Sequence, residues 1–132
     1  MPDDRVPLLL IEDNPADQRL LIELLEYAAP GRFRVASARR LSEGIEILGT
    51  GGFAVVLLDL SLPDAVGVAA VAAVRGAVPT TPVIVLSGLL DDDLRQCAGE
   101  RGAAASFVKG EESIAPLIAA IDELMRECGS IQ

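Results

Sequence analysis

The segment LLLIED (residues 8–13) places an apolar run directly before two acidic residues. Three later segments have the same form, because VVLLD (55–59), VIVLS (83–87) and SFVK (106–109) each end in a polar or charged side chain. If these runs are neighbouring parallel strands, their carboxyl ends lie along one edge of a sheet. That edge would hold three acidic side chains, one hydroxyl and one lysine. Such a set is suited to a divalent metal ion and a phosphoryl group.

Strand-like and helix-like segments alternate along the chain. Continuous apolar runs favour central parallel strands that are buried on both faces. Asn14 and Pro15 suit the cap and the first residue of a helix. The patterns predict strands at 6–11, 33–37, 53–58, 82–86 and 105–108, and helices at 15–28, 41–48 (with Ser42 as its cap), 66–78, 91–101 and 114–125. Leu62-Pro63-Asp64 is typical of a turn, and the acidic run 91–93 is typical of a helix start.

Five βα repeats predict an α/β fold, in which a doubly wound five-stranded parallel sheet carries helices on both faces. In such sheets ligands bind at the carboxyl ends of the strands. The 132 residues fit a single domain, residues 1–132, with its folded core at about 6–127. Because only 3% of the residues are aromatic, aliphatic side chains must form that core.

Composition excludes several classes of function. A net charge of −9 argues against direct nucleic-acid binding. The absence of histidine excludes a Ser-His-Asp triad and histidine-ligated zinc. Cys97 and Cys128 are far apart in the sequence, which predicts two structural thiols in a reducing compartment. No apolar run approaches the ~18 residues that span a bilayer, and no signal-peptide pattern is present, so we expect a cytoplasmic protein with no membrane insertion.

Three converging carboxylates without a cation would repel one another and raise at least one pKa. Mg²⁺ prefers oxygen ligands and would relieve that repulsion. The site therefore predicts Mg²⁺ as the cofactor.

Four motifs together resemble the receiver domain (CheY-like) of bacterial two-component response regulators. They are LLLIEDNPADQRLL (8–21), VVLLDLSLPDAVG (55–67), VIVLSG (83–88) and GAAASFVKG (102–110). The resemblance covers about residues 7–127, and it implies a flavodoxin-like sheet with strand order 2-1-3-4-5.

The resemblance also implies roles at the strand ends. Asp59 would be the phosphoacceptor, attacking the phosphorus of a phosphohistidine. Asp13 and Asp59 would bind Mg²⁺ directly and Glu12 through water, and the backbone carbonyl of Ser61 would be a further ligand. Lys109 would pair with the phosphoryl oxygens.

Two further residues would report the phosphoryl group. Ser87 would donate a hydrogen bond to it after transfer, and Phe107 would be the aromatic switch that follows Ser87. The chain departs from the family pattern at three other positions: Gly110 stands where proline is frequent, Glu12 where aspartate is more common, and Gly88 where alanine is usual. Phe107 also lacks the hydroxyl of the more common tyrosine.

The leading interpretation is a stand-alone signalling switch that is phosphorylated by a histidine kinase or a histidine phosphotransfer protein. It would not be an enzyme beyond its own phosphoryl transfer and slow autodephosphorylation, and it would signal by contacts with an output protein. Such an output protein, or a second copy in a homodimer, would use the face formed by the fourth helix, fifth strand and fifth helix. A degenerate receiver that binds partners without phosphorylation is the alternative. A haloacid-dehalogenase-type phosphatase would need Asp-x-Asp after the first strand, and a nucleotide-binding domain would need a glycine-rich loop there; neither pattern is present.

Overall fold

The computed structural model describes residues 4–62 and 65–130. Its strands are β1 (Val6–Ile11), β2 (Phe33–Ala38), β3 (Val55–Asp59), β4 (Ser61–Leu62), β5 (Ala65–Val66), β6 (Val83–Ser87) and β7 (Ala103–Val108). Its helices are α1 (Pro15–Ala28), α2 (Leu41–Leu48), α3 (Ala69–Ala77), α4 (Asp92–Glu100) and α5 (Ile114–Ser130), and a 3-10 turn at Glu111–Ser113 precedes α5. Among the described residues, no helix has both the length and the apolarity that a bilayer crossing requires.

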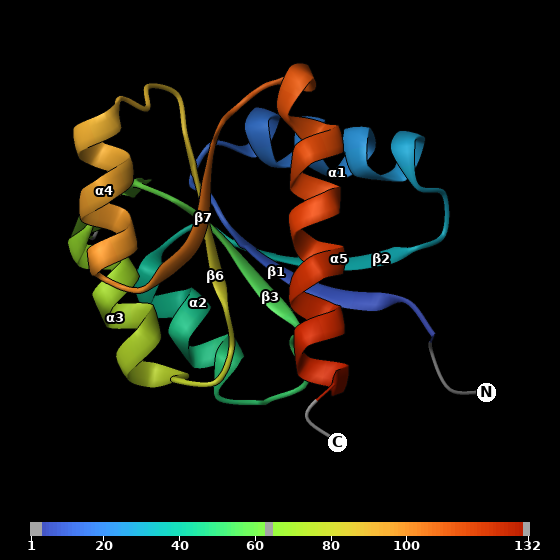
Figure 1. Ribbon diagram of the computed structural model, residues 1–132, viewed down its shortest axis with the longest axis horizontal. Coiled ribbons are helices and arrows are strands. Elements are labelled where there is room, and N and C mark those ends of the chain that lie inside the picture. The colour runs from blue at the N-terminus through green and yellow to red at the C-terminus, as the bar shows by residue number, and fades with distance from the viewer. Residues whose placement is uncertain (1–3, 63–64, 131–132) are drawn as a thin grey trace.

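The five long strands form one parallel sheet in the order β2-β1-β3-β6-β7 (Figure 1). The short strands β4 and β5 form a separate antiparallel pair. Counted along the chain, the five long strands therefore have the predicted order 2-1-3-4-5, and the doubly wound α/β fold is confirmed.

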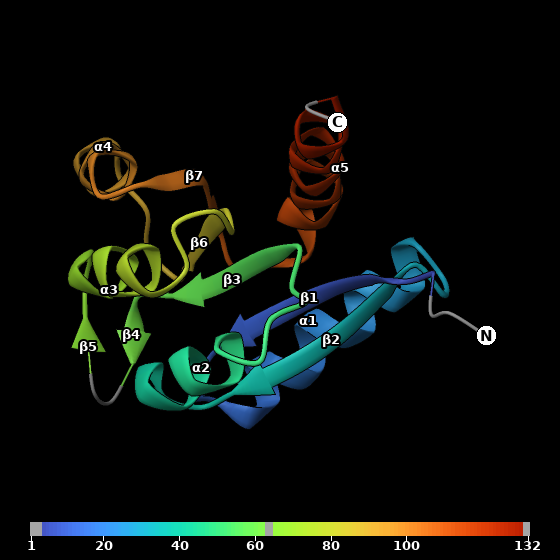
Figure 2. The same cartoon turned by 90° about the horizontal axis from the view of Figure 1, so that it is seen from below.

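Alternate residues of the central strands pack on opposite faces of the sheet. From β1, Leu8 and Leu10 join a core that includes residues of α1 and α5. Leu9 and Ile11 join a second core that includes residues of α2, α3 and α4. Figure 2 shows α1 and α5 on one side of the sheet and the other three helices on the opposite side. Because both faces are covered, β1, β3 and β6 have continuous apolar runs rather than alternating ones.

Leu57 lies at the centre of this arrangement, on the middle strand β3, and is fully buried. We expect Leu57→Ala to lower the free energy of unfolding by about 3 kcal/mol, because it removes buried methyl groups and leaves a cavity. Urea unfolding measures the change. Leu89→Ala is the control, because the same side chain is 86% exposed there and should change stability by less than about 0.5 kcal/mol. Equal losses for the two variants would contradict this description of the core.

Two helices start as the sequence predicts. The Asn14 side chain accepts the N–H groups of Ala16 and Asp17 at 2.9 and 3.3 Å, and Pro15 is the first residue of α1. The Asp91 carboxylate accepts the N–H of Leu94 at 2.8 Å and caps α4. The acidic run that follows Asp91 therefore belongs to a helix start.

The predicted start of the third helix and the predicted cap of the second were wrong. α3 begins at Ala69 rather than at residue 66, because Ala65–Val66 forms β5 and Gly67 has a φ of +75°, which interrupts a helix. α2 begins at Leu41, so Ser42 lies inside its first turn and is not its cap. Instead, the Glu43 carboxylate accepts the N–H of Arg39 at 2.8 Å, just before the helix. Most of the predicted turn Leu62-Pro63-Asp64 lies outside the described residues.

Candidate metal and phosphoryl site

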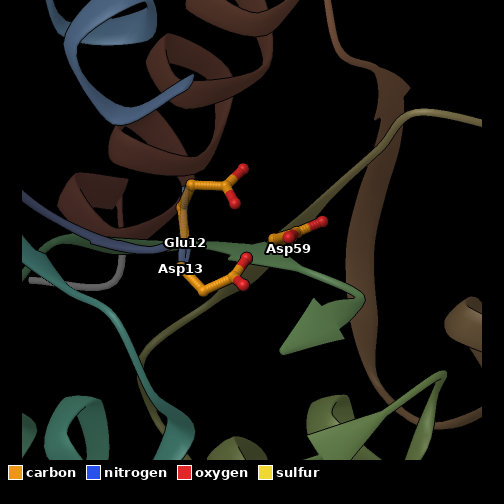
Figure 3. A group of neighbouring side chains, drawn as sticks. All are labelled: Glu12, Asp13 and Asp59. Atoms are coloured by element: carbon orange, nitrogen blue, oxygen red, sulfur yellow. The ribbon is translucent and has the colours of Figure 1, made fainter. Parts of the chain in front are cut away.

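Three carboxylates meet where β1 and β3 end (Figure 3). Glu12 and Asp13 directly follow β1, and Asp59 is the last residue of β3. The two strands pair in parallel with Ile11 opposite Leu58, which brings their ends to the same level. Each of the three side chains offers an oxygen that lies within 4.8 Å of the others. Glu12 and Asp59 are only 3% and 2% exposed, whereas Asp13 is half-buried.

Lys109 supplies the positive charge of this cluster. It follows β7, and its backbone N–H donates to the carbonyl of Ser87 at 2.9 Å. Its ammonium contacts the Glu12 carboxylate directly and lies 3.4 Å from Oδ1 of Asp59. The predicted approach of Lys109 to the acidic residues is present in the structure.

Burial and the charges of the cluster shift two pKa values. Burial raises the pKa of Glu12 from 4.5 to about 7, and repulsion from Asp59 adds to the rise. Contact with Lys109 and a hydrogen bond from the N–H of Asn14 oppose that rise but do not cancel it. For Lys109, burial of the ammonium lowers the pKa, but the hydrogen bond to Glu12 and the attraction of Asp59 outweigh it, so the pKa lies above its usual 10.5. The cluster therefore favours added positive charge.

Ser87 and Phe107 lie on the neighbouring strands β6 and β7. Ser87 is buried, and its hydroxyl donates to the carbonyl of Leu89 at 2.7 Å, in the loop before α4. Phe107 is half-buried against the core on the side of α1 and α5. Leu86 pairs with Phe107 and Ser87 with Val108 across the two strands. Both residues thus lie at or near the carboxyl ends of neighbouring strands, and their roles as switch residues stay predictions.

Residues 8–122 match the family model of the response regulator receiver domain. The chain belongs to this family. The predicted family is therefore confirmed, and a receiver domain takes part in two-component signalling as the phospho-acceptor.

Individual proteins agree with the family assignment. Transcriptional activator protein PfeR of Pseudomonas aeruginosa is 35% identical over 119 residues, which are 90% of this chain and 37% of that protein. Protein-glutamate methylesterase/protein-glutamine glutaminase 4 of Myxococcus xanthus is 33% identical over 117 residues, which are 86% of this chain and 33% of that protein. The crystal structure of the phosphorylated cyanobacterial phytochrome response regulator RcpA is 25% identical, covers 90% of this chain and 92% of its own, and has a TM-score of 0.72. The receiver chain thus spans about a third of the length of the two sequence relatives.

The acidic cluster of this receiver domain fits Mg²⁺ by its donor set. All three side chains offer carboxylate oxygens, which hard cations prefer. Lys109 pairs with Glu12 and Asp59, so the three carboxylates together with this ammonium carry a charge of −2 when all are ionised, which a divalent cation would balance. Ser61, whose carbonyl is the fourth predicted ligand, is two residues after Asp59 in β4. Its role as a ligand stays a prediction.

The loop after Lys109 explains one departure from the family pattern. Gly110 has a φ of +145°, a conformation that favours glycine. A Cβ at this position would also lie 3.0 Å from the carboxylate oxygens of Glu112. Proline holds φ near −65° and is not compatible with this loop. The backbone between Lys109 and the 3-10 turn therefore favours glycine at position 110.

Asp17 is a neighbour of the site that no sequence pattern assigned to it. Its Oδ2 lies 3.3 Å from the Lys109 ammonium, across 92 positions of sequence. Its position in the first turn of α1 is typical of an acidic residue that interacts with the helix dipole. Only the fold shows that this turn faces Lys109.

Proposed function

We propose that this receiver domain accepts a phosphoryl group on Asp59 from the phosphohistidine of a histidine kinase or a histidine phosphotransfer protein. The observation that carries the proposal is the buried Asp59 carboxylate with a lysine ammonium at 3.4 Å and two further carboxylates beside it. The family assignment and the phosphorylated state of the RcpA structure support it.

The chemistry needs no protein base, because a carboxylate is already a nucleophile at neutral pH. An Asp59 oxygen forms a bond to phosphorus as the phosphorus–nitrogen bond of the donor breaks. The bonding pair leaves with the imidazole nitrogen, which takes a proton from water. Lys109 donates hydrogen bonds to the transferring oxygens and balances their charge.

Glu12, Asp13 and Asp59 would hold Mg²⁺, with the Ser61 carbonyl as a further ligand. When bound, Mg²⁺ neutralises charge on the phosphoryl oxygens and reduces repulsion among the carboxylates. Asp13 and Asp59 would be direct ligands, and Glu12 would act through water.

Ser87 and Phe107 would convert the new charge into a change of surface. A phosphoryl group adds about −1.5 to −2 units of charge at one point. The Ser87 hydroxyl, which now donates to Leu89, would turn to the phosphoryl oxygen, and Phe107 would follow into the space that it leaves. An output protein, or a second copy of the chain, would bind the face formed by α4, β7 and α5.

The proposal is tested by incubating the protein with Mg²⁺ and acetyl phosphate and measuring the intact mass. We expect one labile phosphoryl group per chain, and none when EDTA removes the metal ion. Absence of the adduct at every Mg²⁺ concentration, in a folded sample, would contradict the proposal and favour a receiver that acts without phosphorylation.

A further inference from the structure

Lys109 is the only lysine in the chain, and its ammonium is shared among three carboxylates. It contacts Glu12, lies 3.3 Å from Oδ2 of Asp17 and lies 3.4 Å from Oδ1 of Asp59. An ammonium group has three N–H donors and no more. Glu12 and Asp17 occupy two of these donors, and Asp59 lies beside the ammonium as an ion pair. A phosphoryl oxygen that arrives on Asp59 therefore competes with these carboxylates for the ammonium.

The three carboxylates differ in the free-energy cost of losing contact with the Lys109 ammonium. The side chain of Glu12 is only 4% exposed, so losing its cation would leave a buried charge unpaired. Asp59 carries the phosphoryl group itself and keeps Lys109 beside it. The side chain of Asp17 is 43% exposed, so water can replace the lysine at small cost.

We propose that Asp17 is a positioning residue, which holds the Lys109 ammonium toward α1 and releases it when a phosphoryl group arrives on Asp59. This inference rests on the proposed function of Asp59. Asp17 competes with the incoming phosphoryl oxygens for the same donor, and its negative charge also repels them. It therefore slows phosphorylation of the resting protein without belonging to the predicted metal ligands.

Asp17→Asn removes this competition while it keeps the size of the side chain. We expect the variant to accept a phosphoryl group from acetyl phosphate about two- to fivefold faster than the wild type, since exposed ion pairs have effects of that size. Asp17→Glu restores the carboxylate and should return the rate to near the wild-type value. Glu23→Gln is the matched control, because it removes the same charge from an exposed residue of α1.

The position of the ammonium can be followed directly, because ¹⁵N-lysine labels one side chain only. Without metal or phosphodonor, we expect Asp17→Asn to shift the Nζ resonance and to speed proton exchange with water. Glu23→Gln should do neither. A change confined to stability would not produce this difference at the Nζ atom of a folded protein.

Three results would overturn the inference. An Nζ resonance that is the same in the wild type and Asp17→Asn would show that Asp17 does not hold the ammonium. Equal rates for Asp17→Asn and Glu23→Gln, or a slower rate for Asp17→Asn, would show that it does not compete with the phosphoryl group. In these cases the wild type still forms the adduct and the proposed function stands, whereas a wild type that forms no adduct overturns both.

Discussion

Asp59→Asn is expected to lower the rate of phosphoryl acceptance by at least about a thousandfold, to below detection. An amide is not a competent nucleophile at neutral pH, and neither neighbouring carboxylate occupies the same position at the end of β3. The measurement is intact mass after incubation with acetyl phosphate and Mg²⁺. Asp93→Asn is the control, because this substitution removes the same charge from an exposed residue in the first turn of α4.

The control should accept one phosphoryl group at the wild-type rate. An adduct on Asp59→Asn at a rate near that of the wild type would assign the nucleophile to another residue. Loss of the adduct in both variants would instead point to a general effect of charge. Circular dichroism of each variant confirms that a missing adduct does not result from unfolding.

Glu12→Gln is expected to make the metal-free protein more stable at pH 8, and to do so far less at pH 4.5. The pKa of Glu12 rises from 4.5 in the unfolded chain to about 7 in the fold. The folded protein therefore binds more protons between these values, and its stability falls as pH rises from 4.5 to about 7. At about 1.36 kcal/mol per pH unit, the loss assigned to Glu12 is about 3 kcal/mol. Glutamine has no charge to bury and lacks this loss.

Thermal unfolding of both proteins in EDTA, across pH 4.5 to 8, measures the difference. For a domain of 132 residues, about 3 kcal/mol corresponds to roughly 10 °C in Tm. The Tm difference between Glu12→Gln and wild type should grow with pH and level off above pH 7. Ionisable groups that do not interact with Glu12 cancel in this difference, because they have the same surroundings in the two proteins. Lys109 stays charged across this range, because its pKa lies above 10.5. A difference that does not vary with pH would contradict the raised pKa of Glu12.

At pH 8, added Mg²⁺ should make the wild type more stable than Glu12→Gln. Binding to the folded state raises Tm, and the ionised wild-type cluster offers one more carboxylate than the variant. We therefore expect Mg²⁺ to stabilise the wild type more at pH 8 than at pH 5.5, where the proton on Glu12 opposes binding.

The fold was predictable because its signals are local. Each central strand is a continuous apolar run, and each ends in the polar residue that forms the site. Parallel pairing then brings Asp13, Asp59 and Lys109 to one edge without further information. The start of α1 was also predictable, since Asn14 and Pro15 fix it through backbone chemistry alone.

The features that sequence patterns missed depend on contacts distant in the chain or on backbone conformation. Ala65–Val66 lies in an alanine- and valine-rich stretch that resembles a helix, but it pairs with β4. The role of Gly110 depends on a φ of +145°. Asp17 meets Lys109 only because α1 and the end of β7 lie beside each other in the fold. Periodicity along one segment contains none of this information.

The most direct test of the central claim is to locate the phosphoryl group on the chain. Borohydride reduces an acyl phosphate to an alcohol, so a phosphorylated aspartate becomes homoserine, and peptide mass spectrometry identifies its position. We predict homoserine at residue 59, only after incubation with both Mg²⁺ and phosphodonor. Homoserine at residue 13 instead, or reduction at neither position in a sample whose intact mass shows the adduct, would contradict the assignment of Asp59 as the phosphoacceptor.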